Sequence, residues 1–158
     1  KLKFLITSQF WRFSMMYNRI LLAVDLTDES IKVANKAVAL CKATGAELII
    51  LHVIESLNYA YGGDVPIDIT DIQAQLEETA KERISILEAQ LDTPFQESCI
   101  TQGGIESEIH RIAEEKKADL IIVGSHCRHG LALLLGSTAN GVLHGAPCDV
   151  LAIKVSKA

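Results

Sequence analysis

The sequence predicts an α/β fold: a five-stranded, mainly parallel sheet between two layers of helices. Five short apolar segments alternate along the chain with four segments whose apolar residues recur at helical spacing. The apolar segments are continuous rather than alternating with polar residues, which is typical of strands covered on both faces. Strands and helices that alternate in this way form βαβ units with right-handed crossovers, here a three-layer α/β/α sandwich.

Five segments of the sequence are predicted to be strands. The third is more polar than the others, which favours a position near an edge of the sheet. In chain order, the strands are expected at Ile20–Val24, Glu47–Val53, Gln96–Thr101, Leu120–Val123 and Val150–Val155.

Four helices are predicted between these strands. Thr27-Asp28-Glu29-Ser30 provides a capping candidate and two acidic residues for the first helical turn, and Gly45 lies where the C-cap belongs. The second helix carries an apolar face from Ile69 to Leu91 and stops before Pro94. The third is marked by Ile105, Ile109, Ile112 and Ala113, and the fourth is expected at Ser137–His144.

Length and composition favour one globular domain. With 158 residues, 49% of them hydrophobic and 22% charged, the chain belongs to neither the disordered nor the fibrous class. A net charge of -5 argues against nucleic acid or an anionic membrane as a partner. No stretch reaches the roughly 18 apolar residues of a membrane span. The four cysteines form no CxxC pair, so we expect reduced thiols in a cytoplasmic protein.

The first fifteen residues differ from the rest of the chain. Residues 1–15 contain three basic residues and no acid, and polar residues interrupt their apolar run, which argues against a secretory signal. We interpret residues 1–15 as a tag remnant or a leader translated from upstream of a start at Met15 or Met16. The alternative is an arm that packs on the domain or on a partner. The domain itself is assigned to residues 16–158.

One segment late in the chain predicts a ligand site. Gly124-Ser125 follows the fourth predicted strand, and Gly136-Ser137-Thr138 opens the fourth predicted helix. Glycine and hydroxyl residues at a helix start let a backbone approach phosphates, where N–H groups and the helix dipole favour an anion. Ligands of parallel sheets bind beyond the carboxyl ends of the strands, which also selects Asp25-Leu26 and Val53-Ile54. Together these residues indicate a nucleotide-type ligand.

Each of these residues also has a purely structural interpretation. Gly124 and Ser125 would form a tight strand exit, followed by an ordinary Ser/Thr helix cap at Ser137 and Thr138. Asp25 would be an acid that only orients the turn into the first helix. His126, Cys127 and His129 have the atoms of zinc ligands, but a structural zinc site normally needs four ligands, so we predict no metal site.

Motifs of the common enzyme classes are missing from the sequence. It contains no GxxxxGK[ST] phosphate loop, no GxGxxG after the first strand and no GxSxG nucleophile elbow. Asp25 and His126 form an imaginable acid–base pair for ATP hydrolysis, but without a lysine or a clear magnesium site the transition-state charge would be poorly stabilised. We therefore predict no catalytic residue, and at most slow, incidental hydrolysis.

Five blocks of the chain resemble the universal stress proteins. The resemblance implies a Rossmann-like sheet of strand order 3-2-1-4-5 and usually a homodimer. It also implies a role in bacterial stress survival, with or without bound ATP or AMP. Magnesium would bind together with ATP. The blocks are AVDLTDES (Ala23–Ser30), LIILHV (Leu48–Val53), ADLIIVGSH (Ala118–His126), LLLGSTANGVL (Leu133–Leu143) and APCDVLAI (Ala146–Ile153).

The same resemblance assigns roles to single residues. Asp25, followed by Leu26, matches an aspartate beside the adenine, and Val53 would present its backbone N–H and C=O groups to the adenine edge. Gly124 fits the first position of the phosphate signature, and Gly136-Ser137 fits its last pair. Cys127 stands where the signature has its second glycine, and the loop that follows is one residue shorter. A cysteine there disfavours positive φ or fills the space of a phosphate.

These observations leave three hypotheses. The first is a dimer that binds an adenine nucleotide and acts through nucleotide-dependent contacts with protein partners, whose identity the sequence does not give. The second is a nucleotide-free dimeric scaffold of the same fold, and the third is a weak ATPase or adenylate-transferring enzyme. In the family topology Val150–Val155 is an apolar edge strand, which pairing with a second copy would bury.

Overall fold

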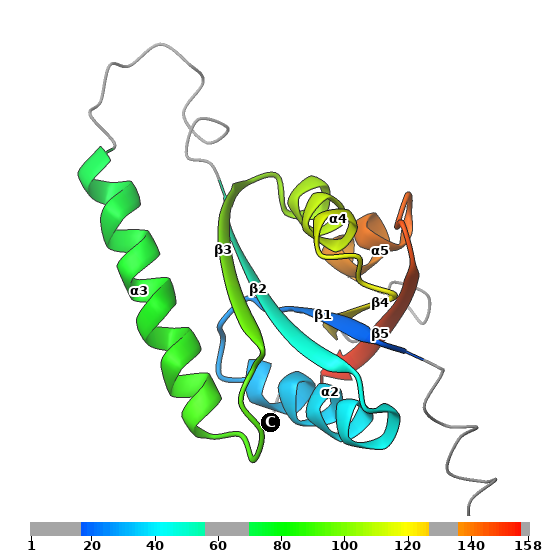
Figure 1. Ribbon diagram of the computed structural model, residues 1–158. Helices are drawn as coiled ribbons and strands as arrows, with labels where there is room; N and C mark the ends of the chain where they lie inside the picture. The colour runs from blue at the N-terminus through cyan, green and yellow to red at the C-terminus, as the bar shows by residue number, and fades with distance from the viewer. Residues whose placement is uncertain (1–16, 56–69, 127–135, 156–158) are drawn as a thin grey trace, which may run out of the picture.

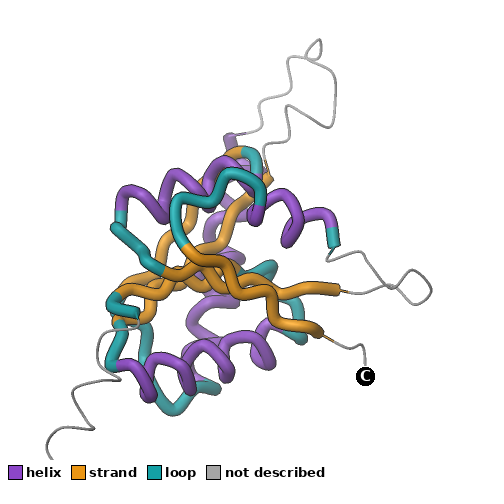
Figure 2. Tube along the Cα trace, turned by 90° about the vertical axis from the view of Figure 1, so that its right-hand side faces the viewer, coloured by secondary structure: helices purple, strands orange, loops and turns teal. Residues whose placement is uncertain are grey.

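The computed structural model describes residues 17–55, 70–126 and 136–155, so the predictions for residues 1–15 lie outside the described residues. The five strands form one sheet of order β3-β2-β1-β4-β5, with parallel pairing between all neighbours. The sheet lies between two layers of helices (Figures 1 and 2), which confirms the predicted fold class and strand order. The elements are β1 (Arg19–Ala23), α2 (Ser30–Thr44), β2 (Glu47–Glu55), α3 (Thr70–Ala89), β3 (Glu97–Gly103), α4 (Ile105–Glu115), β4 (Leu120–His126), α5 (Ser137–Leu143) and β5 (Asp149–Val155).

The central strand β1 supplies both halves of the core. Ile20 and Leu22 belong to the cluster that α2 and α3 cover, and Leu21 belongs to the cluster under α4 and α5. All three side chains are fully buried. Because successive side chains of a strand point to opposite faces, only an uninterrupted apolar run can fill both clusters, as the sequence of β1 predicts.

Helix α2 ends as predicted but begins later than predicted. It starts at Ser30, so Asp28 and Glu29 precede the first turn, and no side-chain hydrogen bond caps the helix. At the other end Gly45 adopts a φ of 79°, the left-handed C-cap that glycine favours. Cys41 is buried on the inner face, and burial raises the pKa of its thiol to about 11. This cysteine therefore stays protonated at neutral pH.

Helix α3 packs on the sheet through its C-terminal half. Ala80, Ile84 and Leu87 are buried in the core, whereas Ile72 and Leu76 keep 44% and 38% of their surface exposed. The predicted apolar face is therefore correct for the second half of the helix and only partly covered in the first. In Figure 1 the helix stands beside β3 at the edge of the molecule. Neither α3 nor another helix in the described ranges is long and apolar enough to cross a membrane.

Strand β4 is longer than predicted. The sequence indicates a strand end at Val123, but β4 continues to His126. The reason is its partner β5, which pairs with Gly124, Ser125 and His126 through Ile153, Lys154 and Val155. Pairing with a neighbouring strand thus overrides the weak strand preference of glycine and serine.

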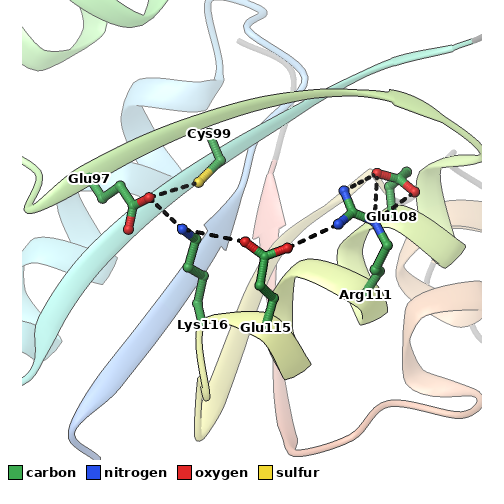
Figure 3. A network of polar contacts seen from close by, with 6 residues as sticks. All are labelled: Glu97, Cys99, Glu108, Arg111, Glu115 and Lys116. Carbon is green, nitrogen blue, oxygen red and sulfur yellow. Dashed lines mark hydrogen bonds and ion pairs between the residues drawn. The ribbon is translucent and has the colours of Figure 1, made fainter.

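A chain of charged groups joins β3 to the outer side of α4 (Figure 3). Lys116 Nζ lies 2.5 Å from Glu97 Oε1 and 3.6 Å from Glu115, and Arg111 connects Glu115 to Glu108. The hydrogen bond from Lys116 lowers the pKa of the Glu97 carboxyl, against the opposing effect of burial. Since most of these side chains are substantially exposed, each pair adds little to stability.

Asp119 connects the beginnings of the two central strands. Its carboxylate accepts hydrogen bonds from the backbone N–H groups of Asn18 and Arg19, at 2.7 and 3.0 Å, and from the Asn18 side chain. Its own N–H donates to the carbonyl of Arg19. Burial raises the pKa of this carboxyl, but the hydrogen bonds together outweigh burial, so the pKa lies below its usual range.

We predict that Asp119→Asn destabilises the protein by about 1 kcal/mol at pH 7, because an amide nitrogen would face backbone N–H donors. The folded pKa of Asp119 is lowered, so its contribution is fully present above the unfolded pKa of about 3.9 and disappears as the pH falls through the folded value. Urea denaturation between pH 7 and pH 2 should therefore show a smaller loss of stability on acidification in the variant. Asp92→Asn, at an exposed ion pair with Lys42, is the control and should match the parent. Identical curves for all three proteins would contradict the assignment.

Candidate functional site

A cleft of about 1460 Å³ opens over the carboxyl ends of β1, β2 and β4. This edge is the switch point of the sheet, because the chain proceeds from β1 to β2 and β3 on one side and returns to β4 and β5 on the other. Helices α3, α4 and α5 also contribute to the walls. The cleft contains eight of the nine residues that the sequence selects for ligand contact, namely Asp25, Leu26, Val53, Ile54, Gly124, Gly136, Ser137 and Thr138.

Ser125, the ninth selected residue, is not among the residues that line the cleft. It is buried within β4, with 4% of its surface exposed, and pairs with Lys154 of β5. Its neighbour Gly124 does reach the cleft, where a Cβ atom would lie 3.4 Å from Val33 and 3.5 Å from Val155. Gly124 therefore forms part of the cleft wall within a strand rather than part of a loop.

The β1–α2 turn is organised by the carboxylate of Asp25. Its Oδ1 accepts hydrogen bonds from the Thr27 N–H at 3.1 Å, the Thr27 hydroxyl at 2.8 Å and the Ser30 hydroxyl at 2.9 Å. These bonds match the structural interpretation of Asp25, as an acid that orients the turn. The same residue lines the cleft, so an orienting role and a ligand contact are compatible at one position.

The backbone of Val53 faces the space beyond β1. The Leu51 carbonyl accepts a hydrogen bond from the Val24 N–H, so the polar backbone groups of Leu51 point toward β1. Residues two apart in a strand direct these groups to the same side, and those of Val53 therefore point the same way. Since the pairing of β1 with β2 ends at Leu51, the N–H and C=O of Val53 are directed toward the cleft.

Gly136 introduces α5 in a conformation that only glycine adopts readily. Its φ of 83° and ψ of 149° lie where a side chain would collide with the backbone. Gly136 is also the N-cap, and no side-chain hydrogen bond caps this helix. Ser137 and Thr138 are therefore the first helical residues rather than its cap, and both line the cleft.

Two further residues of the cleft wall were not selected from the sequence. Arg83 Nη1 donates a hydrogen bond of 3.2 Å to the carbonyl of Leu26, and the ring Nδ1 of His52 lies 2.9 Å from the carbonyl of Val24. Both side chains line the cleft. Arg83 follows Leu76 and Ala80 at helical spacing, so a basic residue interrupts the apolar face of α3 where that face meets the site.

The part of the cleft wall formed by α3 is apolar because Leu76 and Ala80 line it. The part formed by α4 is lined by the apolar residues Ile105 and Ile109. The described lining also contains the carboxylates of Asp25, Glu29 and Glu55 and the guanidinium of Arg83. Apolar walls with a few polar groups at one sheet edge suit a flat ring that carries hydrogen-bonding groups.

The structure leaves the metal prediction open. Cys127 and His129 lie outside the described residues, and the described part of the chain contains no group of three His, Cys, Asp or Glu side chains that could hold a metal ion. The absence of a metal site therefore stays a prediction from the sequence.

Comparison with known proteins identifies the family. The family model described as "Universal stress protein family" matches residues 16–154, nearly the whole chain. The chain belongs to the universal stress protein family. Among curated members, universal stress protein A homolog 1 of Coxiella burnetii is 37% identical over 88% of this chain and 97% of its own length. Universal stress protein A homolog 2 of the same organism is 40% identical over 88% of this chain and 96% of its own.

Solved structures agree with the universal stress protein fold. The hypothetical protein MJ0577 superposes with a TM-score of 0.72 at 30% identity, covering 90% of this chain and 99% of its own. A universal stress protein in complex with cAMP superposes with a TM-score of 0.55 at 26% identity, covering 87% and 96%. The resemblance seen in the sequence is thereby confirmed, and one structural relative binds a cyclic adenine nucleotide.

We predict that alanine destabilises the protein at one of the two glycines of the cleft and is tolerated at the other. Gly136→Ala should destabilise the protein by about 1–3 kcal/mol, because a Cβ atom strains its backbone conformation. Gly124→Ala should stay within about 0.5 kcal/mol of the parent, since its Cβ would make ordinary contacts with two valines. Urea denaturation of both variants measures the difference. Equal destabilisation by the two substitutions would contradict this description of the cleft.

Proposed function

We propose that this universal stress protein binds an adenine nucleotide, ATP or AMP, in the cleft at the switch point of its sheet. Bound nucleotide would alter the surface around the cleft and so regulate contacts with protein partners during stress. One observation carries the proposal: residues from the β1–α2 turn, β2, β4 and the start of α5, selected separately along the sequence, line a single cleft. The cAMP complex of a structural relative supports an adenine ligand.

Each wall of the cleft is suited to one part of such a ligand. The backbone groups of Val53 would pair with the polar edge of the adenine, with Asp25 beside it. Gly124, Gly136, Ser137 and Thr138 would surround the phosphates, where a glycine backbone allows close approach. The apolar side chains of α3 and α4 would exclude water from the ring.

Binding rather than turnover is the proposed activity. The sequence has no phosphate-loop lysine to stabilise the charge of a phosphoryl-transfer transition state. Magnesium would enter together with ATP, held by the phosphate oxygens, and would neutralise part of their charge. The proposed location is the cytoplasm, in keeping with the separated cysteines of the sequence.

A nucleotide-free dimeric scaffold is the second candidate. The three hydrogen bonds of Asp25 within its own turn favour it, because they explain this residue without a ligand. Cys127 at the second glycine position of the family signature points the same way. The third hypothesis, a weak ATPase or adenylate-transferring enzyme, gains no such observation.

We predict that titration calorimetry detects micromolar binding of ATP or AMP and much weaker binding of GTP, with magnesium affecting ATP most. Gly136→Ala should weaken binding at least tenfold, or about 1.4 kcal/mol, because it displaces the start of α5. Gly145→Ala is the matched control, since Gly145 also has a positive φ of 84° but lies outside the cleft lining. Absence of heat and of thermal stabilisation at millimolar nucleotide would refute the first proposal and leave the scaffold.

We also propose a homodimer that forms through β5 (Asp149–Val155). This strand is an edge of the sheet, and Leu151 on it exposes 40% of its surface. An apolar edge strand offers unpaired backbone groups to a second copy, and symmetric pairing would cover both.

Leu151→Asp is predicted to convert the dimer to a monomer, because two carboxylates would be forced into the interface. Sedimentation velocity measures the change in mass. Ile86→Asp, at an apolar residue of α3 that is 59% exposed, should leave the dimer intact. A monomeric parent protein, or a dimer that Leu151→Asp does not weaken, would exclude this interface.

A further inference from the structure

Leu26 occupies a backbone conformation that needs support. Its φ of 57° is left-handed, although it is a branched residue rather than a glycine, and its side chain is buried in the core under α2 and α3. Such a conformation is unfavourable for an L-residue and persists only where its surroundings hold it. Leu26 directly follows Asp25 in the cleft wall, so any relaxation of Leu26 would move the Asp25 carboxylate.

Arg83 is the polar group that holds this residue from another element. Its guanidinium donates a 3.2 Å hydrogen bond to the Leu26 carbonyl across 57 residues of sequence. A planar guanidinium on a helix holds a carbonyl in a defined direction, and a charged donor strengthens the bond.

The position of Arg83 along α3 makes this bond consequential. Ile84 and Leu87, which follow it, are buried, whereas Ile72 and Leu76 are more than a third exposed. Arg83 thus lies within the packed half of the helix, between the buried Ala80 and Ile84, and its bond connects that half to the β1–α2 turn. The apolar anchoring of α3 places the donor, and the donor orients the carbonyl.

We propose that Arg83 is a positioning residue of the cleft: it stabilises the left-handed Leu26 and thereby orients Asp25 for ligand binding. This inference rests on the proposed nucleotide function for its ligand, but its effect on the turn exists without any ligand. Arg83 acts through Leu26 and does not bind the phosphates. The consequence is that α3 and the switch-point turn respond together when the cleft is occupied.

The first test uses the ligand-free protein. Hydrogen exchange of the Thr27 amide, which donates to Asp25, reports the order of the turn. Arg83→Met should accelerate this exchange about fivefold, the effect of losing one hydrogen bond. Arg83→Lys should restore part of the protection, because an ammonium can still donate to the carbonyl. Lys81→Met, which removes an exposed helix cation paired with Glu77, is the control and should leave Thr27 unchanged. Unchanged Thr27 exchange in Arg83→Met would overturn the proposal.

The second test measures the affinity for adenosine, AMP and ATP by titration calorimetry. Arg83→Met should raise all three dissociation constants by a similar factor, about fivefold, because the turn would contact the adenosine group that the three ligands share. A loss confined to AMP and ATP would show that Arg83 contacts phosphate, which overturns the positioning role. If the parent protein binds none of the three, the proposed function fails, and Thr27 exchange still decides the role of Arg83.

Discussion

The early end of the central strand is the constraint on which the site depends. Strand β1 is covered on both faces and stops at Ala23, while β2 continues from the paired Leu51 to Glu55 and β4 from the paired Val123 to His126. The two longer neighbours therefore project past the end of β1, and the space between them is the floor of the cleft. The backbone groups of Val53 face this space because β1 no longer fills it, and Gly124 of β4 also lines the cleft. The buried side chains of β1 hold the sheet between its two helix layers. Because β1 is shorter than β2 and β4, it leaves the space in which the site forms.

Two kinds of interaction hold the turn that closes the end of β1. Within the turn, Asp25 accepts hydrogen bonds from Thr27 and Ser30. From outside, Arg83 holds the Leu26 carbonyl. A role of Asp25 in ligand binding is therefore compatible with its structural role in the β1–α2 turn. A carboxylate fixed by its own turn is already oriented when a ligand arrives, which reduces the entropy lost on binding.

Local pattern in the sequence predicts the fold class, the family resemblance implies the strand order, and most of the residues selected for ligand contact line one cleft. The continuous apolar run of β1 and the C-cap at Gly45 are determined by neighbouring residues, and both were predicted correctly. The extension of β4 was missed, because only its pairing with β5 keeps Gly124 and Ser125 in a strand. Arg83 was missed for a related reason: an arginine on a helix is ordinarily solvated, and its partner Leu26 lies 57 residues away. The strain at Leu26 has no sequence signal at all, since leucine seldom adopts a positive φ.

The two edges of the sheet differ in a way that limits assembly. Glu97, Ser98 and Gln102 are exposed on β3, and Lys116 adds a charge beside them, whereas β5 is mostly apolar. Polar and charged side chains discourage strand addition, so β3 terminates the sheet. Open-ended growth of a sheet from molecule to molecule requires that both of its edges pair with another copy. In the described sheet, β5 is suited to such pairing and β3 is not. Any association through β5 is thereby self-limiting, and the protein is protected from forming filaments through its sheet.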